Sequence, residues 1–151
     1  MKETDDVRIH KVLKAAAVAE IQAIAIYDAE CFWIRERDRL AVLRRIRAEE
    51  VEHGGFISGW VQVPGWEKIM NRAMGRVLGT ALACLPWRTL CRVQAWAEEQ
   101  ASAIYLQAVQ ELDTSMGSDQ RPGLLEGLRE ASRSEARHAA EFRALGTQFR
   151  A

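Results

Sequence analysis

The pattern Glu-x-x-His occurs twice in this chain, at Glu50–His53 and at Glu135–His138. Residues three apart lie on one face of a helix, so each pattern would present a carboxylate and an imidazole together. Upstream of each pattern lies a glutamate that stands seven residues before a tyrosine, Glu20 before the first pattern and Glu98 before the second. The order Glu, Glu-x-x-His, Glu, Glu-x-x-His is the ligand set of a carboxylate-bridged di-iron or di-manganese site inside a four-helix bundle.

This recurrence is uncommon by chance. The chain has three His and fifteen Glu, so a given His has about a one-in-ten chance of following a Glu by three residues. Two of the three histidines do so. The competing interpretation is that these residues are solvated charges on the helix surfaces of a Glu-rich protein. The position of each residue on its helix separates the two interpretations.

Four long segments have the hydrophobic periodicity of amphipathic helices, because ten Gly and three Pro interrupt the chain only rarely. We expect helices from an N-cap among Thr4, Asp5 and Asp6 to about Arg35, from Asp38 to Gly54–Gly55 or one turn later, around Glu98 to near Asp113, and from Leu124 to about Leu145. The linker 113–123 is the clearest loop. The pattern predicts an all-α, ferritin-like four-helix bundle that forms a single domain over residues 1–151.

The six acidic and imidazole residues fall on the apolar stripes of these helices, where core residues are expected. Glu20 lies between Ala16 and Ala23 on the stripe of the first helix. Burying such groups without partners would cost several kcal/mol for each lone charge, whereas divalent metal ions take carboxylates and imidazoles as ligands. The sequence therefore predicts the following metal ligands and catalytic residues: Glu20, Glu50, His53, Glu98, Glu135 and His138.

Other residues near this set have more than one interpretation. Tyr27 and Tyr105 each follow a lone glutamate by seven residues, and we expect packing or hydrogen bonding from them before a role as redox relays. Glu49 could orient a histidine from outside the ligand set, or be an exposed charge. For Glu52 and Glu99, which point elsewhere on their helices, we expect ordinary exposed charge.

The connection between the second and third long helices, residues 60–90, is rich in Trp and Gly. Val63–Trp66 predicts a turn, an apolar run extends from Ile69 to Leu85, and Pro86 should kink or restart the helix. A ferritin-like bundle needs a long crossover at this place. The segment could pack on the bundle, form a subunit contact, lie on a bilayer or line an apolar substrate channel.

The composition of the chain limits which partners and which cellular location are expected. The chain has 21 Lys and Arg and 21 Asp and Glu, so its net charge is zero. It therefore lacks the excess of positive charge that is typical of nucleic-acid-binding proteins. Cys31, Cys84 and Cys91 lack a Cys-x-x-Cys spacing, which predicts small buried residues in a reducing compartment. We find no signal peptide and no apolar stretch long enough to span a membrane. We expect a cytoplasmic protein, either soluble or peripheral on the inner face of the cell membrane.

The chain resembles the demethoxyubiquinone hydroxylase family of coenzyme Q biosynthesis over nearly its whole length, from about Lys11 to Leu145. The resemblance rests on separations of 30, 48 and 37 residues between successive glutamates of the set, on the run Leu78–Leu82, and on the tyrosine after each lone glutamate. Members of this family are ferritin-like di-iron monooxygenases that sit on a membrane surface and hydroxylate a polyprenylated benzoquinol.

The resemblance implies a division of the ligands between two iron ions, or two manganese ions. One ion would be held by Glu20, Glu50 and His53, and the other by Glu98, Glu135 and His138. Glu50 and Glu135 would bridge the pair. The resemblance further implies O2 and an apolar quinone-type molecule as substrates, NADH or a reductase as external reductant, and contact with a membrane surface. A homodimer is a further expectation.

Several alternatives use the same residues. The family usually has His-Ala-Gly where this chain has Ala17–Ala19, and His-Tyr where it has Ile104-Tyr105, so another apolar substrate stays open. A ferroxidase or mini-ferritin could employ all six ligands to handle iron. A rubrerythrin-like peroxidase is less favoured, because an extra ligand and a Cys-x-x-Cys centre are absent. The last alternative is a metal-free bundle that serves as an interaction module.

Overall fold

The computed structural model describes residues 2–115 and 122–148, and within these ranges the chain is all α-helical, with no strand. The helices are α1 (Lys2–Trp33), α2 (Arg37–Ser58), α3 (Gly65–Ala83), α4 (Trp87–Ser115) and α5 (Pro122–Gln148). None of these helices is long and apolar enough to cross a membrane. The all-α prediction is confirmed.

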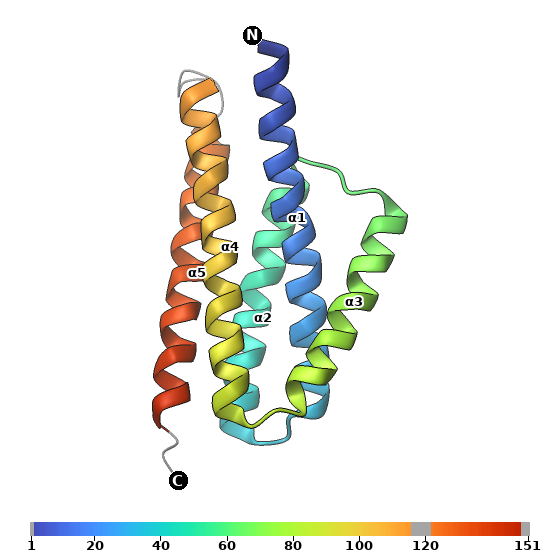
Figure 1. The fold of residues 1–151 in the computed structure, drawn as a ribbon, viewed down its shortest axis with the longest axis vertical. Helices are drawn as coiled ribbons and strands as arrows, with labels where there is room; N and C mark the ends of the chain where they lie inside the picture. Colours follow the sequence, from blue (N-terminus) through green and yellow to red (C-terminus); the bar gives the residue numbers. More distant parts are fainter. Residues whose placement is uncertain (1, 116–121, 149–151) are drawn as a thin grey trace.

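The four long helices, α1, α2, α4 and α5, lie side by side, with α3 on the outside of α1 (Figure 1). In the view of Figure 1, α1 descends and α2 returns upward, whereas α4 ascends and α5 descends. The helices α2 and α4 therefore run in the same direction, and α3 brings the chain back between them. The long connection predicted for residues 60–90 is thus a helix that serves as the crossover.

Helix boundaries differ from the predicted ones in ways that have local causes. The first helix begins at Lys2, ahead of the N-cap predicted among residues 4–6, whose side chains lie outside the described set. The second helix ends at Ser58, one turn after Gly54–Gly55, which agrees with the later of the two predicted ends; neither glycine adopts the positive φ that ends a helix. The predicted loop 113–123 begins later, since α4 extends to Ser115, and residues 116–121 lie outside the described ranges.

The core consists of two apolar clusters at opposite ends of the bundle. One gathers the N-terminal half of α1 and the C-terminal half of α4, including Leu13 and Tyr105. The other gathers the C-terminal half of α1 and the start of α4, including Ile34 and Leu90. Along α1, Glu20 lies between the residues of the two clusters, and the same holds for the predicted ligands of the other three long helices. The core therefore leaves room for a polar layer at its middle.

Two glycines let α3 lie directly on α1. A Cβ atom on Gly75 would stand 2.6 Å from the carbonyl oxygen of Gln22, and one on Gly79 would stand 2.3 Å from that of Ile26. Next to them, Gln22 donates a hydrogen bond to Asn71 over 2.7 Å. The small and polar side of α3 thus faces the bundle.

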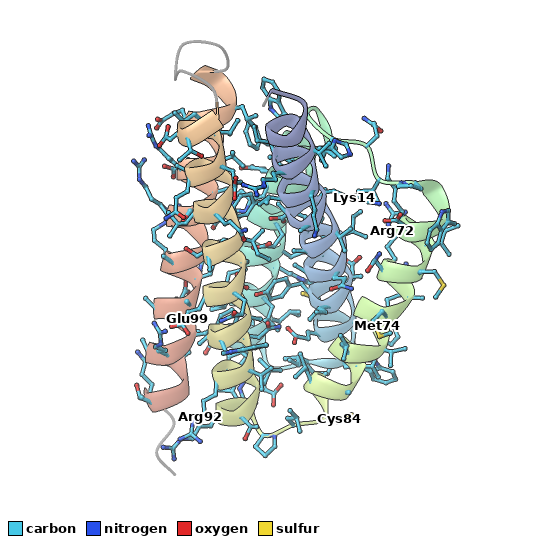
Figure 2. The ribbon with its side chains drawn as sticks, turned by 45° about the horizontal axis from the view of Figure 1, so that its top comes forward. Lys14, Arg72, Met74, Cys84, Arg92 and Glu99 are labelled. Carbon is cyan, nitrogen blue, oxygen red and sulfur yellow. The ribbon has the colours of Figure 1, made fainter. Side chains whose placement is uncertain are left out.

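The opposite side of α3 is apolar and exposed to solvent. Trp66 is 68% exposed, Ile69 is 69% exposed, and Met74, which is labelled on α3 in Figure 2, is 52% exposed. Of the alternatives for segment 60–90, packing of α3 on the bundle is therefore what the structure shows, but through its small residues. The large apolar side chains remain available for another contact.

Candidate metal centre

All six residues predicted as ligands meet in the polar layer between the two core clusters. One comes from α1 (Glu20), two from α2 (Glu50 and His53), one from α4 (Glu98) and two from α5 (Glu135 and His138). Five of the six are buried, and the side chain of His53 is 14% exposed. The 3.6-residue period that places apolar side chains in the core also turns these six inward.

The side chains form two overlapping groups that could each hold a metal ion. Within each group, one ligand atom from every residue lies within 4.8 Å of the others. The two carboxylates common to both groups are Glu50 and Glu135. The first group adds Glu20 and His53, and the second adds Glu98 and His138. Two adjacent cation sites with two shared carboxylates are what this arrangement allows.

The oxygen and nitrogen atoms that could bind a metal, and that face one another in the cluster, lack hydrogen-bond partners. His53 Nδ1 lies 2.9 Å from Glu135 Oε1, and His138 Nδ1 lies 3.3 Å from Glu50 Oε1, but neither contact has the geometry of a hydrogen bond. The buried atoms of the cluster without a partner are Glu20 Oε2, Glu50 Oε1, His53 Nδ1, both Glu135 oxygens and His138 Nδ1. Buried polar atoms normally have partners. Cations would satisfy all of these lone pairs at once, so the residues present fit a metal pair.

The electrostatics of the cluster follow from the crowding of carboxylates away from water. Burial raises the pKa of Glu20, Glu50 and Glu98, and the charge of Glu135 raises it further. Burial opposes ionisation of Glu135 too, but contacts with His138 and His53 lower its pKa. Protons and metal ions therefore compete for the same oxygens, and binding of cations would release protons.

A second layer of hydrogen bonds holds the carboxylates. The hydroxyl of Tyr27 donates to Glu98, and the hydroxyl of Tyr105 donates to Glu20. Each tyrosine therefore bonds to the lone glutamate of the other helix, and not to the one that precedes it in sequence. The predicted hydrogen-bonding role of the two tyrosines is confirmed.

Glu49 on α2 lies beside His138 on α5. Its Oε2 is 2.9 Å from His138 Nε2 and accepts a hydrogen bond from Ser134 over 3.2 Å, while Arg45 donates to its Oε1 over 2.8 Å. A carboxylate on the distal nitrogen fixes the ring and its tautomer, so that Nδ1 can face the cluster. Of the two interpretations of Glu49, the orienting one agrees with this geometry.

The remaining charged and sulfur-bearing residues are outside the cluster. Glu52 is exposed, as expected, and Glu99 pairs with Arg143. The cysteines are free, but only one of the three is buried: Cys91 is buried, Cys31 is half-buried and Cys84 is exposed. The prediction that all three are buried is therefore wrong for Cys84, which directly follows the last residue of α3.

Sequence reasoning missed a buried carboxylate one turn below Tyr27. Glu30 has 0% exposure, and Gln94 donates a hydrogen bond from Nε2 to Glu30 Oε1 over 2.7 Å. Burial raises the pKa of Glu30 to about 8. The available signal was position, because Glu30 follows Tyr27 by three residues on the stripe that carries Glu20.

A cavity of about 190 Å³ adjoins the cluster between α1 and α4. Glu20, Glu50 and Glu98 contribute to its wall, and Trp96, an exposed residue, also lines it. Most of the other lining side chains are apolar or small, and none belongs to segment 60–90. The alternative in which this segment lines a substrate channel therefore does not hold for this cavity.

Comparison of the chain with protein-family models, with curated proteins and with solved structures gives no match. The assignment of a function depends on the geometry described above.

Proposed function

We propose that this protein is a ferritin-like di-metal carboxylate oxygenase that hydroxylates an apolar, quinone-type substrate. The observation that supports it best is the set of buried, unpartnered donor atoms that converge from four helices. A solvated surface cluster would not need partners, whereas this one is shielded by apolar core on both sides. The parallel course of α2 and α4, with a crossover between them, suits the ferritin-like bundle.

The residues would divide the work as the two groups suggest. Glu20 and His53 would serve one ion, Glu98 and His138 the other, and the shared carboxylates of Glu50 and Glu135 would bridge. Oxygen and nitrogen donors of this kind suit iron, and manganese is the alternative. When bound, a di-iron centre supplies the reduction of O2 by an external reductant and the insertion of one oxygen atom into the substrate.

The chain's own contribution would be to bind, orient and exclude water. The cavity between α1 and α4 offers an apolar space in contact with three of the ligands. Tyr27 and Tyr105 hold the terminal carboxylates in place, and Glu49 holds His138. A demethoxyubiquinone-like ring placed in the cavity would lie next to the metal ligands, and a longer apolar tail would have to leave past Trp96.

We also propose that α3 contacts a membrane surface. Its outward side carries Trp66, Ile69 and Met70, and the exposed Arg72 and Arg76 add positive charge to the same helix. Apolar residues with neighbouring cations suit the interface of an anionic bilayer. Sedimentation with phosphatidylserine-containing vesicles should recover the protein, and Ile69→Glu should reduce this recovery. Leu106→Glu, an exposed apolar position on α4, is the matched control.

Metal analysis of protein purified from iron-replete cells tests the central proposal. We expect about two iron or manganese ions per chain, by analogy with sites of this ligand set. The loaded protein should consume O2 in the presence of a quinol and a reductant. Rapid O2 consumption with Fe²⁺ alone, together with assembly into a large shell, would instead identify an iron-handling protein. Folded protein without metal would refute both assignments.

A further inference from the structure

The buried pair Glu30 and Gln94 fixes the orientation of one amide group. Gln94 is 3% exposed, and its Nε2 donates to Glu30 Oε1 over 2.7 Å. The nitrogen of the amide is thereby turned toward Glu30, which leaves the carbonyl oxygen, Oε1, on the other side. Among the described residues, no hydrogen-bond donor reaches this oxygen. Gln94 also lines the cavity beside the metal cluster.

Apart from the carboxyl groups of the metal cluster (Glu20, Glu50 and Glu98), the cavity wall offers little other polarity for a ligand. Gln22 is half-buried and bonded to Asn71, and Gln100 is exposed at the surface. Of the lining residues, all of which are described, Gln94 is the neutral polar one that is buried. The apolar or small lining residues are Ala19, Ala23, Ile26, Ala97, Ala101 and Ile104. A ligand that fills this space meets apolar side chains, the carboxyl groups of Glu20, Glu50 and Glu98 on the side of the metal cluster, and one oriented neutral acceptor, that of Gln94.

The size of the cavity limits the ligand to about one ring. Its volume is about 190 Å³. An apolar cavity of ~150 Å³ is large enough to take up benzene. A single six-membered ring with one or two small substituents therefore fits, whereas a second ring or a long chain would have to extend out of the cavity.

We propose that Gln94, positioned by Glu30, is a specificity element of the cavity that selects an apolar ring bearing a hydroxyl group, whose O–H donates to Gln94 Oε1. A ring that fills the cavity excludes water from this oxygen, and an acceptor left without a donor is unfavourable, so a ring that lacks the hydroxyl is discriminated against. The inference rests on the proposed function only in taking this ring as the group to be oxidised. The binding preference itself needs no metal.

Glu30 has the properties of a positioning residue in this arrangement. It is fully buried and does not line the cavity, and its contact with Gln94 is the one hydrogen bond that its side chain makes among the described residues. Burial raises its pKa to about 8. An amide at position 30 would keep an acceptor oxygen, whereas an alkyl side chain would release Gln94 to rotate.

Ligand-observed ¹⁹F NMR with 4-fluorophenol and 4-fluorotoluene tests the proposal, because the two probes differ by a hydroxyl in place of a methyl group. The quantity to compare is the ratio of the toluene Kd to the phenol Kd. This ratio removes the general effect of each substitution on the cavity. Relative to wild type, Gln94→Leu should lower the ratio by about fivefold, the value of one ordinary hydrogen bond. Glu30→Leu should lower it too, and Glu30→Gln should restore most of it.

Two further variants serve as controls for the position and the site of binding. Gln100→Leu replaces a glutamine of the same helix and the same cavity that is exposed, and it should leave the ratio unchanged. Ala101→Phe should fill the cavity and weaken both probes. A ratio that does not respond to Gln94→Leu, or binding that survives Ala101→Phe, would overturn the proposal. Circular dichroism confirms that each variant is folded.

Metal content measured on the same samples separates this proposal from the proposed function. Metal-loaded protein with an unchanged ratio in Gln94→Leu would refute the specificity element alone. Metal-free protein that shows the expected change in the ratio would refute the oxygenase and leave the binding site in place.

Discussion

Tyr27 on α1 donates a hydrogen bond to Glu98 on α4, and so ties the two helices that flank the cavity at the level of the metal cluster. The reciprocal bond from Tyr105 to Glu20 does the same from the other side. The two hydroxyls occupy one oxygen of each lone glutamate, and this restricts how the other oxygen can point. The terminal carboxylates are therefore positioned by the protein before any ion binds.

Loss of one of these hydroxyls should destabilise the protein and leave its core packing intact. Tyr27→Phe keeps the ring that stacks on Phe142 but leaves a buried carboxylate oxygen of Glu98 without its donor. We expect the free energy of unfolding of metal-free protein to fall by about 1–2 kcal/mol, measured by urea denaturation. Tyr105→Phe should behave alike. An unchanged denaturation midpoint in both variants would contradict the hydrogen-bonded arrangement.

Removing a ligand from one group or from both should change the metal stoichiometry differently. His53 belongs to one group of potential ligands, whereas Glu135 belongs to both. We expect His53→Ala to retain about one ion per chain and Glu135→Ala to retain almost none, measured by mass spectrometry of the metals. The control is Glu52→Ala, an exposed glutamate inside the first Glu-x-x-His pattern. Equal losses in all three variants would argue against two overlapping sites.

Neutralising a bridging carboxylate should have opposite effects on the metal-free and loaded protein. Burial and the nearby Glu135 and Glu98 raise the pKa of Glu50, so the ionised form is unfavourable without a cation. Glu50→Gln should therefore stabilise metal-free protein at neutral pH by about 1–3 kcal/mol, because folding no longer requires this buried carboxyl to take up a proton. The same variant should lose the stabilisation that added Fe²⁺ or Mn²⁺ gives to wild type. Calorimetry with and without metal measures both effects.

The pH dependence of stability should carry a contribution from Glu30. Its pKa rises from the ordinary value of 4.5 to about 8 in the folded protein, because burial disfavours the charged form. The unfolded chain therefore loses this proton first, so the contribution of Glu30 to stability is complete below pH 4.5 and falls as the pH rises to 8. The loss should reach at most about 1.4 kcal/mol per pH unit.

Comparison of wild type with Glu30→Gln isolates this contribution from the other buried carboxylates. The difference in unfolding free energy between the two metal-free proteins should change steadily from pH 5 to pH 8 and then level off. A difference that stays constant over this range would show that Glu30 is ionised in the folded protein, contrary to its burial.

The docking of α3 should depend on its glycines. A Cβ atom on Gly79 would stand 2.3 Å from the backbone oxygen of Ile26, so Gly79→Ala must push α3 away from α1. We expect a loss of about 1–3 kcal/mol in stability and faster hydrogen exchange over residues 65–83. Gly65→Ala, on the same helix with no atom within 4 Å of the added carbon, is the control. Unchanged exchange in Gly79→Ala would contradict the close approach.

The predicted ligands came together because helical periodicity is a local property that the sequence carries. Each lay on an apolar stripe, and such a stripe must face the core whichever helix it meets. The same argument applies to Glu30, but the residue predicted to be buried at this place was Cys31 beside it. In the structure, Glu30 is buried and Cys31 only half-buried. Which of two adjacent residues on a stripe is buried depends on the helix that packs against it. Here Gln94 of α4 donates a hydrogen bond to Glu30.

The contacts between side chains of different helices could not be predicted from the sequence either. The tyrosines were expected near the cluster, but their exchange of partners across α1 and α4 depends on the spacing of the two helices. For the apolar run 69–85, the sequence left open whether its large side chains contact the bundle, another subunit, a bilayer or a substrate. The structure buries Gly75 and Gly79, because backbone contact with α1 needs small residues more than it needs large apolar ones.

The pairs α1–α2 and α4–α5 contribute the same residues in the same order, a glutamate and tyrosine on one helix and Glu-x-x-His on the next. Each hairpin thus brings half of the donors, and neither holds a full set. Two identical copies of one hairpin, related by a twofold axis through the cluster, could supply an equivalent set of side chains. What the single chain adds is the freedom for its halves to diverge: Glu49 beside His138 has Ser134 as its counterpart in the other Glu-x-x-His helix.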